Sequence, residues 1–145
     1  MATPTMIFVN LPVSNLAHAT AFYEAIGATK NAQFSDHTAS CMVISDTIHV
    51  MLLTHDKFRE FTPKKIADTK TTSEVLICLS ADSRDAVDGY VAKATGAGGN
   101  ADPSPQQDYG FMYGRSFEDP DGHIWEVMWM DVEAAMKAQS AAATA

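Results

Sequence analysis

Glu126 is the one carboxylate in the apolar segment 123–130, HIWEVMWM. If this segment is a strand, its side chains point alternately to opposite faces, so Trp125, Val127 and Trp129 share a face and Glu126 lies on the other. A carboxylate on an apolar surface is costly to bury unless a metal, a cation or a proton offsets its charge. The spacing therefore predicts that Glu126 faces a cavity, where it could serve as a general acid or base.

Aromatic side chains and one cation precede this strand in the segment DYGFMYGR: Tyr109, Phe111, Tyr113 and Arg115. Aromatic walls with a single guanidinium suit a flat or anionic ligand, because arginine binds carboxylates through two parallel hydrogen bonds. We expect these residues near the rim of the cavity, with Arg115 as the carboxylate-binding group. The alternative is that half of them pack against the other sheet.

The first part of the chain predicts the elements that position these groups. Alternating apolar residues and β-formers favour strands at 6–13, 39–45 and 47–54, with a weaker one near 30–35. Asn15 is a plausible helix N-cap, and apolar residues at helical spacing follow it until Gly27 ends the helix. The order is β-α-β-β-β.

The same order returns about 68 residues later, with strands at 74–81, 112–118 and 123–130 and a helix over 84–97. The turn DPDG joins the last two strands. Two such modules side by side predict an α+β fold in which a half-open barrel encloses a central cavity. We expect one domain over 1–145, divided into module one (6–54), a connector (55–72), module two (73–131) and a tail (132–145).

The composition of the chain argues against some classes of binding partner. The 145 residues carry a formal net charge of -8, which argues against nucleic acid or an anionic membrane as partner. Half of the ten cations lie between Lys57 and Lys70, where we expect a solvated surface. There is no spanning apolar run and no visible signal peptide, and Cys41 and Cys78 sit in apolar runs typical of buried free thiols. These features favour the cytoplasm.

The repeat, the opening VNLPVSNLAHATAFYEAIG and the closing YGRSFEDPDGHIWEVMWMD resemble the vicinal oxygen chelate superfamily. That group includes glyoxalase I, extradiol dioxygenases, fosfomycin-resistance transferases and bleomycin-binding proteins, and the resemblance covers 6–131. It implies two βαβββ modules around a ligand cavity. In the enzymes, one divalent metal (Zn, Ni, Mn or Fe) is held by four inward side chains from the first and last strands of each module.

Carried onto this chain, the resemblance implies an incomplete metal site. Glu126 matches the last strand of module two and His49 that of module one, but Phe8 stands where the first strand should supply a ligand. In module two, the register leaves either Leu76 or Glu74 at the ligand position. The metal ligands are then at most His49, Glu74 and Glu126, and Phe8 and Leu76 line the cavity.

Several functions follow from these residues. One is a lyase or isomerase resembling lactoylglutathione lyase, with Glu126 and His49 as catalytic residues. A second is a metal-free protein that sequesters a small molecule, favoured by Phe8, Leu76 and the aromatic segment. A third is metal-free acid–base catalysis by Glu126 with His49. Because unpaired sheet edges tend to be covered, we also expect a homodimer.

Overall fold

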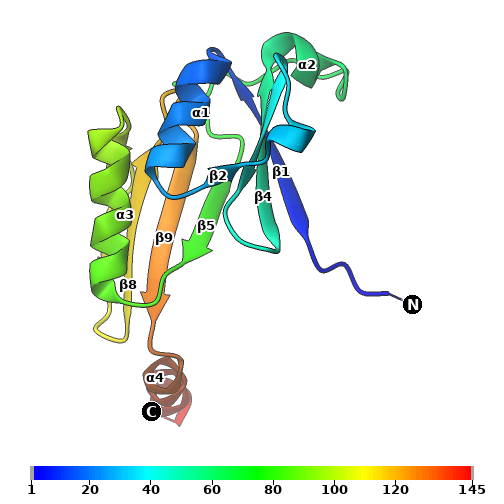
Figure 1. Cartoon of the computed structure of the whole chain (residues 1–145). Coiled ribbons are helices and arrows are strands. Elements are labelled where there is room, and N and C mark those ends of the chain that lie inside the picture. The colour runs from blue at the N-terminus through cyan, green and yellow to red at the C-terminus, as the bar shows by residue number, and fades with distance from the viewer. Residues whose placement is uncertain (1, 145) are drawn as a thin grey trace.

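The computed structural model describes residues 2–144. Module one contains one helix and a four-stranded sheet in the order β1-β4-β3-β2, with β1 parallel to β4 and the other pairs antiparallel. Figure 1 labels its main elements. Their bounds are β1 (Ile7–Val13), α1 (Leu16–Ala25), β2 (Thr29–Lys30), the 3₁₀ turn η1 (Ala32–Phe34), β3 (Ala39–Val43) and β4 (Ile48–Thr54).

Module two repeats this plan in the order β5-β9-β8-β6, with the short β7 added beside β8. The predicted βαβββ repeat and the α+β class are confirmed, although β3 and β5 are shorter than expected and β7 was not predicted. The bounds are β5 (Leu76–Ser80), α3 (Arg84–Gly96), β6 (Asn100–Ala101), β7 (Gln107–Asp108), β8 (Met112–Glu118) and β9 (Ile124–Met130). Outside the modules lie α2 (His55–Arg59) and α4 (Val132–Thr144).

Local side-chain chemistry sets where the two long helices begin and end. The side chain of Asn15 accepts from the His18 backbone N–H at 3.0 Å, and that of Ser83 accepts from the Ala86 N–H at 3.0 Å. Each satisfies an amide that the helix leaves without a partner. Gly27 and Gly98 follow the helix ends with φ of 113° and 97°, a conformation that glycine adopts without penalty.

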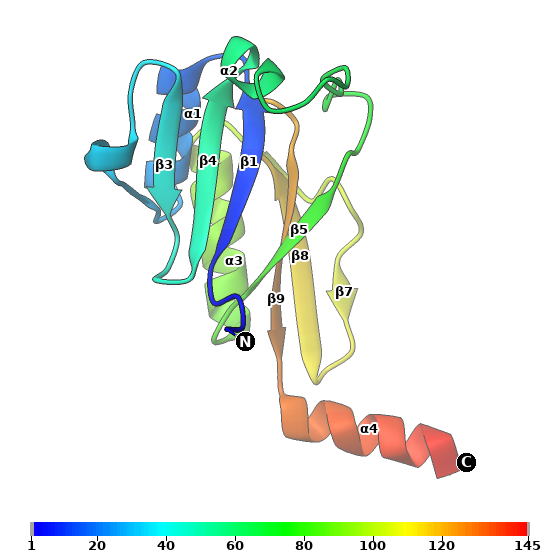
Figure 2. The ribbon, with the colours of Figure 1, turned by 90° about the vertical axis from the view of Figure 1, so that its right-hand side faces the viewer.

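One hydrophobic core runs through both modules. Figure 2 shows the two sheets on one side and α1 and α3 behind them. Between these layers Phe22 and Tyr23 of α1 contact the rings of Phe117 and Trp125, at centroid distances of 6.2 and 5.9 Å. Trp125 Nε1 donates to the Tyr23 hydroxyl at 2.9 Å, so a strand of module two is anchored on the helix of module one.

The turn 119–122 joins module two to both other parts of the chain. The carboxylate of Asp121 accepts from the Ser14 N–H at 2.9 Å, and its carbonyl accepts from Thr69 Oγ1 at 2.5 Å. Gly122 has a φ of 92°, and a Cβ there would lie 2.5 Å from the Thr69 carbonyl oxygen. Only glycine fits this close approach, so the turn fixes the end of the connector.

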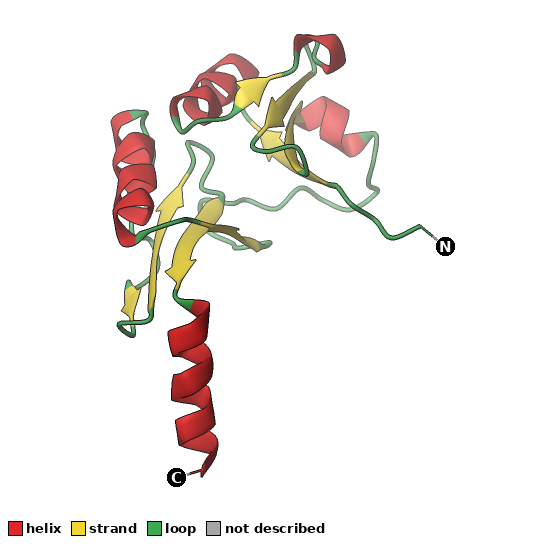
Figure 3. Ribbon diagram, turned by 60° about the horizontal axis from the view of Figure 1, so that its bottom comes forward, coloured by secondary structure: helices red, strands yellow, loops and turns green. Residues whose placement is uncertain are grey.

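The barrel does not close within one chain. In the part of the chain that the structure describes, the two sheets share no hydrogen-bonded strand, and β1 and β5 are edge strands. Figure 3 shows α4 extending away from both modules. None of the helices in residues 2–144 has the length and apolarity required to cross a membrane.

Candidate functional site

Glu126 lies on the face of β9 opposite the helices, as the alternation predicts. Its neighbours Trp125 and Val127 are buried in the core, whereas Glu126 is only partly buried. In register with it stand Cys78 of β5 on one side and Ser116 of β8 on the other. All three line a cavity of about 160 Å³, which Ser104, Pro105 and Gln107 also line. This face of module two presents a carboxylate and a thiol, while the buried Ser116 hydroxyl is bonded to the Ser104 backbone.

The matching face of module one presents an aromatic pair. Phe8 of β1 is in register with His49 of β4, and their rings stack at a centroid distance of 4.7 Å. His49 is 91% buried, and its Nδ1 has no hydrogen-bond partner in the described residues. A buried ring nitrogen without a partner costs free energy, so it marks a place where a bound group would be stabilising.

The strand registers show which residues stand beside the two predicted site residues of the last strands. Phe8 stands beside His49, and the residue beside Glu126 is Cys78. Leu76, seven residues before the N-cap Ser83 as Phe8 is before Asn15, stands beside Ile124, and Glu74 precedes β5. The expectation of a buried Cys78 is wrong, since its side chain is exposed on this face.

The surroundings of Cys78 keep its thiol protonated. Desolvation raises the pKa of Cys78, and the negative charge of Glu126 raises it further. A thiol without a nearby cation is a weak nucleophile at neutral pH, because the thiolate is the reactive form. Cys78 is thus suited to ligand contact rather than to covalent chemistry.

Glu74 lies at the junction between the modules. Its carboxylate is 2.8 Å from His123 Nδ1, and His123 Nε2 donates to the Pro12 carbonyl at 2.7 Å. Burial lowers the pKa of His123, but Asp119, the Pro12 carbonyl and Glu74 together raise it above its ordinary value. Both ring nitrogens can donate at once only in the charged form, which this set of acceptors stabilises.

The predicted metal set does not assemble in the described chain. Within residues 2–144 no group of three or more His, Cys, Asp and Glu side chains is arranged to hold an ion, so His49, Glu74 and Glu126 are not gathered. Phe8, at the remaining ligand position, has no donor atom. The donor set of one chain therefore does not fit the divalent metal that the resemblance implies.

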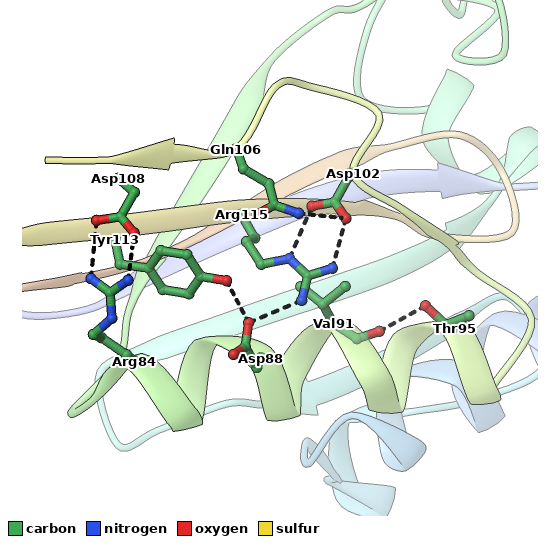
Figure 4. Close-up of polar contacts among 9 residues, drawn as sticks. All are labelled: Arg84, Asp88, Val91, Thr95, Asp102, Gln106, Asp108, Tyr113 and Arg115. Carbon is green, nitrogen blue, oxygen red and sulfur yellow. Dashed lines mark hydrogen bonds and ion pairs between the residues drawn. The ribbon is translucent and has the colours of Figure 1, made fainter. Parts of the chain in front are cut away.

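Arg115 lines the cavity beside Glu126, but carboxylates of this chain hold both its guanidinium and the Tyr113 hydroxyl. Arg115 and Tyr113 share a face of β8 with the buried Phe117, so both turn toward α3 (Figure 4). Arg115 donates to Asp102 from Nε and Nη2 at 3.0 and 2.6 Å, and to Asp88 at 3.0 Å. Two carboxylates of this chain thus occupy the guanidinium of Arg115, so its expected role in carboxylate recognition would require a ligand to displace one of them.

The rest of this network fixes α3 on its sheet. The Tyr113 hydroxyl donates to Asp88 at 2.6 Å, and the guanidinium of Arg84 lies over the Tyr113 ring, 4.4 Å from its centroid. Arg84 also donates to Asp108 of β7, whose pKa falls to about 2 chiefly because of that hydrogen bond. The remaining predicted aromatics, Tyr109 and Phe111, stack on each other at 6.2 Å between β7 and β8.

Comparison with known proteins agrees with this architecture. No curated protein matches the chain. Among solved structures, a hypothetical protein from S. aureus is 26% identical, with a TM-score of 0.73 over 89% of this chain and 95% of that one. A glyoxalase/bleomycin resistance protein/dioxygenase family enzyme from Burkholderia phytofirmans is 17% identical, with a TM-score of 0.71 over 85% and 96%.

The fosfomycin resistance protein FosX from Mesorhizobium loti is 18% identical, with a TM-score of 0.67 over 93% of this chain and 99% of that one. At these identities, the two named relatives show the fold alone. A family model, however, matches residues 5–127, which hold both modules up to the middle of β9. The chain belongs to the Glyoxalase/Bleomycin resistance protein/Dioxygenase superfamily.

Proposed function

We propose that this protein binds and sequesters a small molecule against the open faces of its two sheets, in a cavity that a second copy of the chain completes. The observation that carries the proposal is His49 Nδ1, a buried polar atom without a partner in the described residues, beside the exposed ring of Phe8. A ligand that stacks on Phe8 and hydrogen-bonds to this nitrogen would satisfy both groups.

Exposed apolar side chains support the proposal that a second copy of the chain completes the cavity. Ile7, Phe8 and Leu76 are 55%, 52% and 53% exposed, on the two edge strands β1 and β5. The accessible surface is 8832 Å². A compact monomer of this mass exposes about 7,300 Å², so the excess on one chain exceeds the roughly 800 Å² that each partner buries in a standard interface. A homodimer would cover these strands and bring His49 of one copy toward Glu126 of the other.

The groups on these faces define the class of ligand. Module one supplies an aromatic surface with one ring nitrogen, and module two supplies Cys78, Ser116 and Glu126 around a small cavity. A molecule with a flat apolar part and one or two hydrogen-bonding groups is complementary to this combination. Neither face offers a free cation, so the ligand need not be an anion.

A second candidate function is acid–base catalysis, as in a glyoxalase-like lyase or isomerase. The observation that favours it is the position of Glu126, partly buried in a cavity and flanked by the Ser116 hydroxyl and the protonated Cys78. A carboxylate so placed could take a proton from a carbon next to a carbonyl group. No step of this proposal runs through a metal, because residues 2–144 of one chain do not form a ligand set.

The location of the protein stays a prediction. Cys41 and Cys78 are both free thiols, which is what the reducing cytoplasm requires.

The experiment is a thermal-shift screen of a fragment panel, together with fosfomycin and bleomycin, the antibiotics in the names of the family and its relatives. A compound that raises the wild-type Tm should raise it much less in Phe8→Ala and His49→Leu. Lys93→Gln, on α3, is the matched control and should respond like wild type. Equal responses in all four proteins would contradict the site.

Glu126→Gln separates the two candidate functions. If the protein sequesters its ligand, this variant weakens or keeps binding, and no product appears in either protein. If Glu126 is an acid or base, the wild type converts the ligand and the variant does not, while binding persists. Analytical ultracentrifugation tests the proposed homodimer. A mass of 15.7 kDa at all protein concentrations would contradict it.

A further inference from the structure

A groove of about 810 Å³ lies along the connector, beside the end of β1. Residues 62–70 form one side, and the end of β1 at Pro12, followed by Ser14, forms the other, with Asp121 of module two at the base. Figure 2 shows this segment running from α2 across the ends of the strands toward β5. All three parts of the chain therefore contribute to one groove.

Positive charge gathers around this groove on a chain whose net charge is -8. Arg59, Lys64, Lys65 and Lys70 line it, together with His55. In residues 2–144 no carboxylate forms an ion pair with any of the three lysines, although Arg59 pairs with Asp56 at 2.9 Å. Lys64, Lys65 and Lys70 are exposed, as the predicted solvated surface requires, and the structure places them around a common space.

The two carboxylates of the groove already have partners. Asp121 is 91% buried and accepts from the Ser14 N–H at 2.9 Å, and Asp68 accepts from the Lys70 backbone N–H at 3.1 Å. These amides orient the two carboxylates without neutralising them, and neither pairs with a lysine of residues 2–144. The three lysines outnumber the two carboxylates, so the groove keeps a net positive charge. A concave surface with unmatched charge of one sign concentrates ions of the opposite sign.

The groove is formed before any ligand arrives. Thr69 is fixed to the 119–122 turn by its hydrogen bond and by the close approach of Gly122. Nearer α2, Thr62 Oγ1 accepts from the Lys64 N–H at 3.2 Å, which shapes the turn that carries the two adjacent lysines. A preformed site loses less conformational entropy on binding than a flexible loop does.

We propose that this groove binds a phosphate-bearing small molecule. Lysines bind phosphate oxygens as point charges, and three of them here lack a carboxylate partner in the described residues. Pro12, Pro63 and Ile66 supply an apolar wall for the organic part of such a ligand. The volume is that of a pocket for a drug-sized molecule, whereas an extended nucleic acid needs a longer basic surface.

The test is a titration of the ¹⁵N-labelled full chain with inorganic pyrophosphate at low ionic strength, followed by NMR. The amides of 62–70 should shift along one saturable curve. The double variant Lys64→Gln/Lys65→Gln should weaken binding by about ten-fold or more, because each lost charge-assisted hydrogen bond is strong. Lys30→Gln and Lys93→Gln are matched controls outside the groove and should keep the wild-type Kd.

Three outcomes would overturn the proposal: no saturable shift, equal weakening in the control variants, or binding of a single-stranded oligonucleotide without binding of pyrophosphate. Thermal melts of each variant show that the fold is intact, and Lys70→Gln provides a second, single test at the other end of the groove. The inference does not depend on the sequestering function, since its failure would leave the responses of Phe8 and His49 variants unchanged.

Discussion

The two modules share a topology but attach their helices to their sheets in different ways. In module one, the polar contact between α1 and β3 is a single pair, Thr20 with Ser40, 2.7 Å apart, surrounded by apolar side chains. In module two, Arg115 joins Asp88 on α3 to Asp102 near β6. The common fold thus depends on apolar burial, and the polar contacts have diverged.

The open faces of the two sheets likewise share a backbone arrangement but carry different side chains. The open face of module one carries the Phe8 and His49 pair, and that of module two carries the Cys78 and Glu126 pair. A stacked aromatic pair offers surface and one ring nitrogen, whereas a thiol with a carboxylate offers polar atoms in a small cavity. The repeated architecture therefore constrains where a ligand can bind, while the chemistry of binding differs from one module to the other.

The largest effect should come from breaking the core that the modules share. Trp125→Ala removes a buried ring that contacts Tyr23 and Phe117 and should cost about 3–5 kcal/mol of the free energy of unfolding. Urea denaturation followed by circular dichroism measures it, and both modules should unfold in one transition. Trp129→Ala, at a partly buried position, should cost less, and an equal or larger loss there would contradict the shared core.

The next effect separates the two helix attachments. Arg115→Met leaves Asp88 and Asp102 without their cation and should lower the free energy of unfolding by about 1–2 kcal/mol, since these groups are partly exposed. Thr20→Val should cost about 1 kcal/mol through its two hydrogen bonds. High salt should reduce only the arginine effect. Salt sensitivity in both variants would argue that the modules are attached alike.

A pH series tests the junction between the modules. Because the folded pKa of His123 is raised, its contribution to stability is complete below the ordinary value near 6.5 and is lost as pH rises through the folded pKa. The free energy of unfolding should fall over that range in the wild type and stay flatter in His123→Gln. At the acid end, the lowered pKa values of Asp88 and Asp102 predict loss of stability only below pH 4.

The smallest effect should come from Phe8→His, on an exposed position of β1. The free energy of unfolding should change by less than about 0.5 kcal/mol. If one imidazole is what module one lacks for metal binding, Ni²⁺ should then raise the Tm of the variant but not of the wild type. A rise in the wild type as well would show that the chain binds the ion without this residue.

Much of the fold was predictable because alternation and capping are local. A few neighbouring residues are enough to predict the helix start at Asn15, its end at Gly27, and the opposite faces of Trp125 and Glu126. The face on which Arg115 lies was also predictable, because Arg115 and Phe117 are two residues apart on one strand. The aromatic neighbours of Arg115 instead favoured the prediction of a ligand site. The pairing of Cys78 with Glu126 could not be predicted from the sequence, because it depends on the register of β5 against β9. Whether the sheets close on each other depends on contacts between chains, which one sequence does not specify.

The helix α4 offers a place to attach a spectroscopic probe far from both sheets. Its first residues are fixed, because the Asp131 N–H donates to the Phe111 carbonyl at 2.7 Å and the Asp131 side chain accepts from the Ala134 N–H at 3.1 Å. Thirteen helical residues extend about 20 Å, so its far end is held at that distance from the sheets. A spin label or fluorophore near that end would report the orientation of module two by spectroscopy while leaving both open faces unobstructed.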